Sequence, residues 1–447
     1  MGTQVAPELG SYTAVMRSEL SPFFVSISVA LASFVVAEAA RAQQAGTAHA
    51  GAERAVGFDE ALALTRAAPE VRGETRALAV RARGDASISS LTANPQLYIM
   101  PGWRLSPSAN TGPELQASIV QPFDLGGLAG ARRTSARRER TVLDAHVRAR
   151  ALERRLTAAH DWLFVRASEE DAELLAREQE AATALVDVTT RLAGAGERTS
   201  IALHEARVYR AEVRLRVVDN EGFRHDLGLA LAASLADGSG RGLVEPVATR
   251  GAAPQPDVPA GAALVRMTAR ADTLPAARLA RLSAIAEHAR AAEARASSGA
   301  SLQPGVYVQR DSPGGFVAYG MLTYVPALFE RGQRASSVAE GEAERLEGEA
   351  QRRALDARVE IAGAVHEVEH QREREALMRE TLVPELTALV ALEERAFAAG
   401  ESVLFRALEA RRRSLDVQRR LVEARRDRLW AEVKLWLLLA TLEGEAS

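Results

Sequence analysis

Two stretches of sequence, AGAGERTSIALHEAR at residues 193–207 and FAAGESVLFRALEAR at residues 397–411, decide the fold. Both lie between long patterns rich in Ala, Leu, Glu and Arg, and both hold glycines where one such pattern ends and another begins. Glycine ends helices because it adopts the left-handed backbone conformation without strain. Each stretch is therefore predicted to be the turn of a helical hairpin.

The two hairpins are related by a repeat at a constant offset of 204 residues (397 − 193 = 204). The offset connects the following matches: Pro122 with Pro326, Ala131 with Ala335, Gly196-Glu197 with Gly400-Glu401, Glu205-Ala206-Arg207 with Glu409-Ala410-Arg411, and Leu235-Ala236 with Leu439-Ala440. Matches that keep one offset over more than 100 residues, without a gap, indicate an internal repeat.

The helices that flank the two turns are predicted to be long. The first runs from about Leu128 to Leu192 and returns over Thr199–Leu235, and the second runs from about Gln333 to Ala398 and returns over Val403–Leu442. Apolar residues recur at spacings of three and four, which is typical of coiled-coil packing. Pro384 lies inside the second long helix, where a proline is expected to produce a kink.

Each long helix is preceded by the same signals, a leading helix and then two short β-like runs. The leading helices are predicted over Asp59–Leu91 and Ala260–Ser297. The strands are predicted over Gln96–Leu105 and Glu114–Gln121 in the first half, and over Gly305–Arg310 and Phe316–Val325 in the second. Clusters of Pro and Gly separate the strands of each pair, as in a turn. The chain therefore offers about four strands.

The chain is divided accordingly. The predicted segments are a signal peptide (1–42), a leading helical region (43–95), a first strand pair (96–121), a first helical hairpin (122–236), a linker (237–259), a second leading helix (260–302), a second strand pair (303–325) and a second hairpin with the C-terminus (326–447). The signal peptide rests on the uncharged, largely apolar run Pro22–Ala37 and on Ala40-Arg41-Ala42, which resembles a cleavage site. Translation from Met16 is an alternative to Met1.

The composition excludes several classes of protein. The 447 residues carry 56 basic and 59 acidic side chains, and this balance gives no indication of nucleic-acid binding. The absence of cysteine excludes disulfides and thiolate metal ligands. Aromatic residues make up only 5% of the sequence. Long helices with narrow apolar seams are therefore expected, rather than one large core.

The strands, rather than a helix, are expected to cross a membrane, because no segment after Gln43 is apolar enough for a spanning helix. Four strands cannot close into a barrel, since the smallest single-chain barrels have about eight strands. Open strand edges in lipid cost several kcal/mol for each unpaired backbone group. We therefore expect chains to share one barrel, as a trimer or a similar assembly.

The order of these signals resembles the TolC family of trimeric outer-membrane efflux ducts. Residues 121–127 (QPFDLGG) are similar to the family's strand-to-helix junction, and residues 400–410 (GESVLFRALEA) to its hairpin tip. The resemblance extends over roughly residues 58–443. It implies a mixed fold, all-α together with a membrane β-barrel. Long antiparallel helical hairpins of three chains would form an α-barrel in the periplasm. Four β-strands from each chain would contribute to a shared 12-stranded β-barrel in the outer membrane.

The resemblance also implies a function, that of the passive exit duct of a tripartite efflux system. The implied partners are a homotrimer of the chain, a periplasmic adaptor protein, an inner-membrane pump of the resistance-nodulation-division class and outer-membrane lipid, with no cofactor and no enzymatic activity. Asn94-Pro95 and residues 121–127 resemble the heavy-metal (Czc-type) branch of the family, which would export metal cations. A multidrug efflux duct or a type I secretion duct is the alternative, and a periplasmic coiled-coil adaptor without a pore is less favoured.

Three groups of site residues follow from the resemblance. The candidates for the pore constriction are Arg406 and Glu409; the family has acidic residues at both positions, and Arg406 could neutralise Glu409 three residues further on. The candidates for adaptor docking at the hairpin tips are Gly194, Gly196, Glu197, Gly400, Glu401 and Ser402. The candidates for an aromatic girdle at the membrane surface are Tyr98, Trp103, Phe316, Tyr319 and Tyr324.

One motif points elsewhere, because residues 366–370 (HEVEH) match the HExxH motif of zinc peptidases. Histidines four residues apart share a helix face and could bind Zn²⁺, with Glu367 as the base. A catalytic zinc requires a third protein ligand, however, and no histidine follows His370. The motif also lies within a helix whose apolar seam includes Ile361 and Val365. We therefore predict a solvated helix face with no metal at His366 and His370, and regard a zinc peptidase as the least favoured alternative.

Overall fold

The computed structural model describes residues 54–88, 93–105, 112–195, 199–235, 245–258, 260–311 and 315–444. All of them belong to one compact unit, Arg54–Ser447. The predicted signal peptide lies outside the described residues, as do Gly196 and Glu197 of the first predicted tip.

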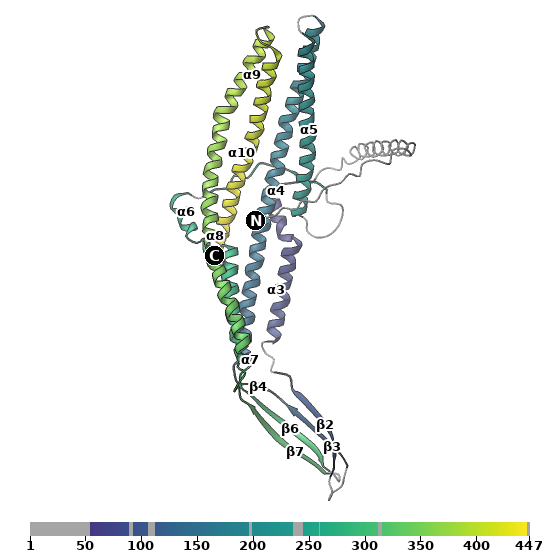
Figure 1. The fold of residues 1–447 in the computed structure, drawn as a ribbon, viewed down its shortest axis with the longest axis vertical. Helices are drawn as coiled ribbons and strands as arrows, with labels where there is room; N and C mark the ends of the chain where they lie inside the picture. Colours follow the sequence, from purple (N-terminus) through teal and green to yellow (C-terminus); the bar gives the residue numbers. More distant parts are fainter. Residues whose placement is uncertain are drawn as a thin grey trace, which may run out of the picture. The chain divides into compact units, whose positions relative to one another are not determined.

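The long helical hairpins are confirmed, with bounds close to those predicted (Figure 1). Helix α4 (Leu128–Gly194) is followed by α5 (Ser200–Leu235). In the second half, α8 (Gln333–Leu377), a π-helical turn (η3, Met378–Leu382) and α9 (Val383–Ala398) are followed by α10 (Leu404–Gly444). The 67 residues of α4 extend over about 100 Å at 1.5 Å per residue. Helices α4 and α5 pack along each other, and so do α8–α9 and α10.

The π-helical turn lies directly before Pro384, the residue at which the sequence predicted a kink. Proline lacks the backbone N–H that would continue the α-helical hydrogen bonds, and it also crowds the preceding turn. A π-helical turn inserts one extra residue into the helix and so accommodates this defect. The long second helix therefore changes its winding at this point without ending.

The leading helices are shorter than predicted, because each is broken near its start. The first half has α2 (Phe58–Leu64), a 3₁₀ turn (η1, Thr65–Ala67) and α3 (Pro69–Ile88). The second half repeats this order with α6 (Gly261–Thr268), η2 (Ala271–Thr273) and α7 (Pro275–Ser297). Ala68 and Leu274 are extended, with ψ near 140°, because the residue before a proline is biased away from the helical conformation. The prediction of single helices there was wrong.

The four predicted strands form one antiparallel sheet. Strands β2 (Gln96–Arg104) and β3 (Gly112–Val120) make a hairpin, and so do β6 (Ser301–Asp311) and β7 (Gly315–Val325). The hairpins join through β3 and β6, and the short strand β4 (Phe123–Asp124) continues β3 along β6. The spatial order is thus β2, β3, β6, β7, which leaves β2 and β7 at the edges. Pro101 does not interrupt β2, since an edge strand tolerates proline.

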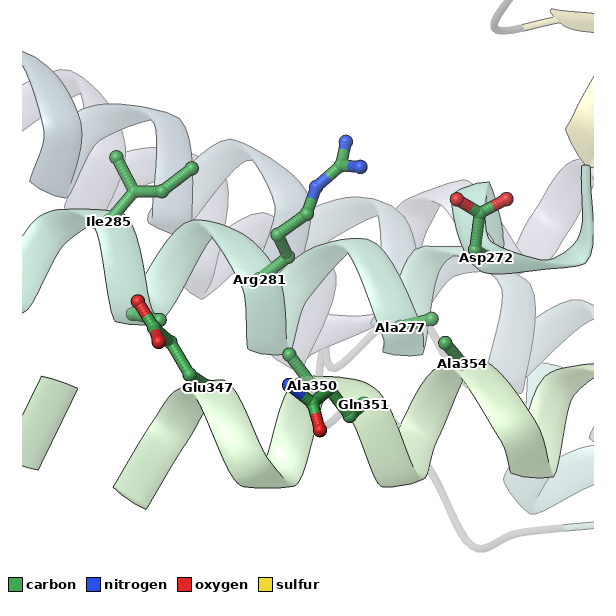
Figure 2. Close-up of a pocket in the computed structure, with 9 residues that line it drawn as sticks. Asp272, Ala277, Arg281, Ile285, Glu347, Ala350, Gln351 and Ala354 are labelled. Carbon is green, nitrogen blue, oxygen red and sulfur yellow. The ribbon is translucent and has the colours of Figure 1, made fainter. Parts of the chain in front are cut away.

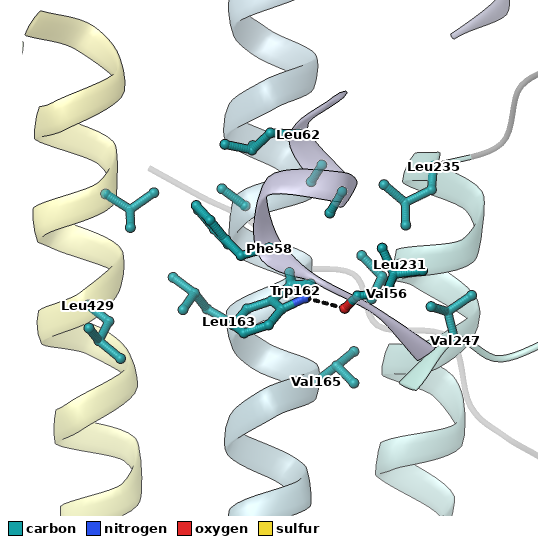
Figure 3. Packing of buried hydrophobic residues seen from close by; sticks show 14 of the residues in the cluster. Val56, Phe58, Leu62, Trp162, Leu163, Val165, Leu231, Leu235, Val247 and Leu429 are labelled. Atoms are coloured by element: carbon teal, nitrogen blue, oxygen red, sulfur yellow. Dashed lines mark hydrogen bonds between the residues drawn. The ribbon is translucent and has the colours of Figure 1, made fainter. Parts of the chain in front are cut away.

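The apolar core is distributed along the helices in separate clusters. One cluster surrounds Trp162 of α4, which packs edge-to-face on Phe58 and donates a 2.8 Å hydrogen bond to the Val56 carbonyl (Figure 3). Strand β1 (Ala55–Val56) is held there by parallel pairing with β5 (Ala248–Thr249). A second cluster joins α8 to α10, and a third joins both hairpins near their turns. Small alanine side chains dominate these seams, as the composition predicted.

None of the helices in the described part of the chain combines the length and the apolar character that a membrane span requires.

Candidate functional site

The four-stranded sheet has one apolar face and one polar face. Side chains alternate between faces along each strand, and the register of the pairs places equivalent positions on the same face. The apolar face consists of Leu97, Ile99, Pro101 and Trp103 on β2, Pro113, Leu115, Ala117 and Ile119 on β3, Leu302, Pro304, Val306, Val308 and Arg310 on β6, and Phe316, Ala318, Gly320, Leu322 and Tyr324 on β7. Arg310, next to the end of β6, is the one charged residue among them.

Large apolar side chains on this face are exposed to a degree that a water-soluble sheet rarely shows. Phe316 is 73% exposed, Leu322 67% and Trp103 64%. Contiguous apolar surface of this kind marks contact with lipid or with another chain. The apolar face is therefore one part of the candidate site.

The opposite face carries the polar side chains of the sheet. It includes Gln96, Glu114, Gln116, Ser118, Gln303, Tyr307, Gln309 and Thr323. Tyr307 donates a 3.2 Å hydrogen bond to Gln309 and stacks on Tyr319 across the β6–β7 pair, with ring centroids 4.7 Å apart. An apolar face paired with a polar one is typical of membrane barrels, whose interior is polar.

The register separates the five aromatic candidates. Trp103, Phe316 and Tyr324 lie on the apolar face, with the first two near the far ends of their hairpins and Tyr324 close to the helices. Tyr98 and Tyr319 lie on the polar face, because each is one residue out of phase with the apolar positions of its strand. The register therefore separates Tyr98 and Tyr319 from the other three candidates, which lie together on the apolar face.

The second hairpin tip has the geometry expected of a tight helix–helix turn. Gly400 adopts a left-handed conformation, with φ of 80°. Its N–H donates to the Phe397 carbonyl, and the N–H of Glu401 donates to the Ala396 carbonyl, which together form a Schellman motif. The Ser402 hydroxyl donates a 3.0 Å hydrogen bond to Glu393, so the turn is held on both sides.

Apolar side chains close to both turns face outward. Val403, Phe405 and Ile201 are each more than half exposed. Behind them, Phe397, Leu404 and Leu408 pack with Val186 and Tyr209 of the first hairpin. Among the other predicted tip residues, Gly194 is the last residue of α4. The tips thus combine a rigid base with an exposed apolar rim.

A network of charged groups joins all four long helices a few turns from the tips. Glu178 of α4 accepts a 2.5 Å hydrogen bond from the Tyr209 hydroxyl of α5 and lies 3.1 Å from Arg411 of α10. Arg411 also contacts Glu394 of α9 at 2.5 Å. Burial, together with the hydrogen bond to Glu178, raises the pKa of Tyr209 well above its usual range, so the hydroxyl stays protonated as a donor. The amino-acid sequence does not single out this network, since arginines are frequent throughout α10.

Two further contacts join α10 to the first hairpin. Arg419 pairs with Asp171 through two bonds of 2.8 and 2.9 Å, and Asn220 donates a third bond of 2.9 Å to the same carboxylate. Arg425 lies 3.4 Å from Glu170. The Arg419 guanidinium gains a raised pKa mainly from its hydrogen bonds to Asp171. Bidentate pairing fixes direction as well as distance, so these contacts set the register of the two hairpins.

The predicted constriction residues lie at the start of α10. Glu409 is half-buried and pairs with Arg413, four residues on, at 3.0 Å. Arg406 is exposed and, within the described residues, makes no ion pair. The partner of Glu409 is thus Arg413 and not Arg406, which the sequence suggested. Ion pairs between residues three apart and four apart are about equally favourable on a helix.

The HExxH motif lies in the last third of α8, with both histidines exposed. Glu367 accepts a 2.7 Å hydrogen bond from Gln371 and so is engaged along its own helix. Within the described residues, no group of three or more histidine and carboxylate side chains is placed to hold a metal ion. The solvated helix face that the sequence predicted is observed.

A cavity of about 300 Å³ lies between α7 and α8 (Figure 2). Its floor is formed by alanines, among them Ala277 and Ala354, and its polar side chains are Asp272, Arg281, Glu347 and Gln351. Glu347 pairs with His288 at 2.8 Å. We interpret this groove as a consequence of small residues at the α7–α8 contact.

Comparison with solved structures shows that the chain shares its fold with several outer-membrane channel proteins. The chain is 14% identical to CusC, a protein described as forming a transmembrane channel, with 87% of this chain and 95% of that chain covered at a TM-score of 0.72. It is 16% identical to the outer membrane protein VceC of Vibrio cholerae, with 86% and 95% covered and a TM-score of 0.66. It is also 14% identical to the Neisseria gonorrhoeae MtrE outer membrane channel in its open state. That comparison covers 86% of this chain and 88% of MtrE, with a TM-score of 0.67.

These likenesses confirm, for the single chain, the mostly helical fold with a small number of strands that the resemblance to the TolC family predicted. No family model matches the sequence, and no curated protein matches it either.

Proposed function

We propose that the chain is one subunit of a trimeric outer-membrane channel of the TolC family. In this proposal the sheets of three subunits close into one barrel in the outer membrane, and the helical hairpins form an α-barrel in the periplasm. The channel acts as the passive exit duct of a tripartite efflux system, together with a periplasmic adaptor and an inner-membrane pump of the resistance-nodulation-division class.

The amphipathic sheet with two unpaired edges carries this proposal. Strands β6 and β7 each have 11 residues and extend about 34 Å from the first residue to the last at 3.4 Å per residue. Tilted by about 40°, such strands rise about 26 Å, which matches the apolar band of outer-membrane barrels. The edges β2 and β7 need partners in lipid. A second and a third copy of the same sheet supply them.

The helices support assembly by the same logic. On α5, Ile201, Val208 and Leu215 recur at intervals of seven residues and are each more than half exposed. On the other hairpin, Leu382 and Leu389 are also seven residues apart and exposed. Apolar stripes at this period fit a coiled-coil neighbour. We propose that α5 of one subunit meets α9 of the next.

The site residues take the following roles in this proposal. The tips around Gly194 and around Gly400, Glu401 and Ser402, with their exposed apolar rim, contact the adaptor; Gly196 and Glu197 belong to the same surface by the repeat. Arg406 and Glu409 line the narrow end of the duct. Trp103, Phe316 and Tyr324 form the aromatic girdle.

Metal cations are the cargo we favour, on the Czc-like sequence features, with multidrug efflux or type I secretion as the alternative. A duct exerts little selection of its own, so the pump that it serves decides between these cargoes.

Reconstitution tests the proposal. The purified chain should run as a heat-resistant trimer from the outer-membrane fraction and should give single-channel currents in planar bilayers. A monomer in the soluble periplasmic fraction, without channel activity, would reject it in favour of the adaptor without a pore. Cross-linking through a cysteine placed at Ser402, in cells that express the neighbouring genes, should capture the adaptor.

A further inference from the structure

His366 and His370 stand on the free face of α8. That helix packs on α10 through Ile361, Ala364 and Val368, which are buried, whereas both histidines are exposed. Their rings are nearly parallel, at 19°, and their centroids lie 6.4 Å apart. Side chains four residues apart lie above one another on a helix, so the two imidazoles border one common space in solvent.

Neither imidazole has another partner. Other histidines of the chain are engaged: His288 pairs with Glu347 at 2.8 Å, and His146 lies 3.2 Å from Glu74. No hydrogen bond or ion pair of His366 or His370 occurs within the described residues. Their ring nitrogens are therefore available to an external ligand.

The charges around the pair favour a cation. Glu369 and Glu373 follow His366 by three and seven residues, share its helix face and are exposed. The neighbouring cations are directed away, since Arg372 pairs with Glu432 and Arg374 with Asp427, both on α10. The free face of α8 thus presents two imidazoles and two carboxylates without a compensating positive charge.

We propose that His366 and His370 form a two-imidazole binding site for a divalent first-row transition cation, such as Cu²⁺, Ni²⁺ or Zn²⁺. Imidazole nitrogen is a preferred ligand of these ions, with bonds of about 2.0–2.1 Å for zinc. The rings can turn toward one ion because both are free in solvent. Water completes the coordination, so the ion is exchangeable and Glu367 has no catalytic part. The site does not depend on the proposed channel function.

Copper provides the sharpest test. The full-length protein, purified without a histidine tag and stripped with chelator, is titrated with Cu²⁺ and examined by electron paramagnetic resonance. We expect hyperfine coupling to two equatorial nitrogens in the wild type and to one in His366→Gln or His370→Gln. Dissociation constants for Cu²⁺ and Ni²⁺ should rise about tenfold or more in either variant, because each loses the chelating pair.

His204→Gln is the matched control, since His204 is also exposed on a long helix but has no histidine one turn away. Its affinity should equal that of the wild type. The proposal is overturned if His204→Gln weakens binding as much as His370→Gln, or if the double variant keeps the two-nitrogen signal. Far-ultraviolet circular dichroism checks that each variant remains folded, so that loss of binding is assigned to the imidazoles.

Discussion

Glu409 shows how the ion-pair partner of a single residue can differ from the one that the sequence suggests. The sequence places Arg406 three residues before Glu409, and Arg412 and Arg413 three and four residues after it, and spacings of three and four are both compatible with an ion pair. The structure has Glu409 paired with Arg413. Arg406 is thereby left to act on its surroundings as an uncompensated positive charge.

This arrangement predicts opposite effects on ion selectivity. In the proposed duct, Glu409→Ala should lower the cation-to-anion permeability ratio by roughly two- to tenfold, because three carboxylates would be lost from the narrow end. Arg406→Ala should raise the ratio. Reversal potentials in bilayers under a salt gradient measure both. If neither variant changes the ratio, these residues do not line the conducting path.

Glu178 of α4 contacts two of the other long helices, α5 through Tyr209 and α10 through Arg411. Glu178→Gln removes the charge that Tyr209 and Arg411 both contact, and hydrogen bonds to charged groups are worth about 1.5–3 kcal/mol each. We expect a clear fall in the thermal unfolding midpoint, followed by circular dichroism.

Glu212→Gln provides the comparison for Glu178. Glu212 also pairs with an arginine of α10, Arg412, but its side chain is 43% exposed, against 17% for Glu178, so its loss should cost less than about 1 kcal/mol. Equal effects of the two substitutions would show that the Glu178 network adds nothing beyond a surface ion pair.

At the scale of elements, the sequence was sufficient for the long helices and for the four long strands. Where apolar residues recur at spacings of three and four over 40 residues or more, only an α-helix fits the pattern. The glycine at position 400 is sufficient to predict the turn between two such helices. The breaks before Pro69 and Pro275 were missed because the Ala- and Arg-rich pattern continues through them. The sequence could not show on which face of the sheet Tyr98 and Tyr319 lie. Side chains alternate between two faces along a strand, and only the register of the paired strands shows which of these faces is apolar.

The two halves also provide a comparable pair of helix starts. Gly127 and Gly332 directly precede α4 and α8, and both are left-handed, with φ of 76° and 71°. Around Gly127 a Cβ atom would meet open space, whereas at Gly332 it would collide with the Ala294 carbonyl oxygen of α7.

Alanine at these two positions should therefore separate backbone strain from collision. In both variants the left-handed conformation lowers the free energy of unfolding by about 1–2 kcal/mol. Only Gly332→Ala must also displace α7, so its unfolding midpoint should fall several degrees further than that of Gly127→Ala. Equal midpoints would contradict the close approach of α7 to the start of α8.

At the scale of the whole molecule, the two faces of the sheet determine where the protein can reside. Leu322 and Thr323 are neighbours on β7 with side chains on opposite faces. On the lipid-facing side of a barrel, an arginine near the bilayer midplane costs about 2–4 kcal/mol, whereas the lumen accepts it.

Leu322→Arg should consequently reduce the fraction of heat-resistant oligomer recovered from the outer membrane several-fold, and Thr323→Arg should leave it close to that of the wild type. Gel migration of unheated and heated samples measures this fraction. If Thr323→Arg is the more harmful of the two, the lipid-facing and lumen-facing sides have been assigned the wrong way round.

The unpaired edges of β2 and β7 have a consequence for biogenesis. A lone subunit in lipid would expose two rows of unsatisfied backbone groups, so subunits must meet before or during their passage into the bilayer. The rate of insertion should therefore depend on the concentration of subunits with an order greater than one. On dilution this rate should fall more steeply than in proportion to the concentration. At low expression the protein would accumulate as unassembled subunits. Doubling its synthesis would more than double the number of the proposed channels that are inserted in the membrane.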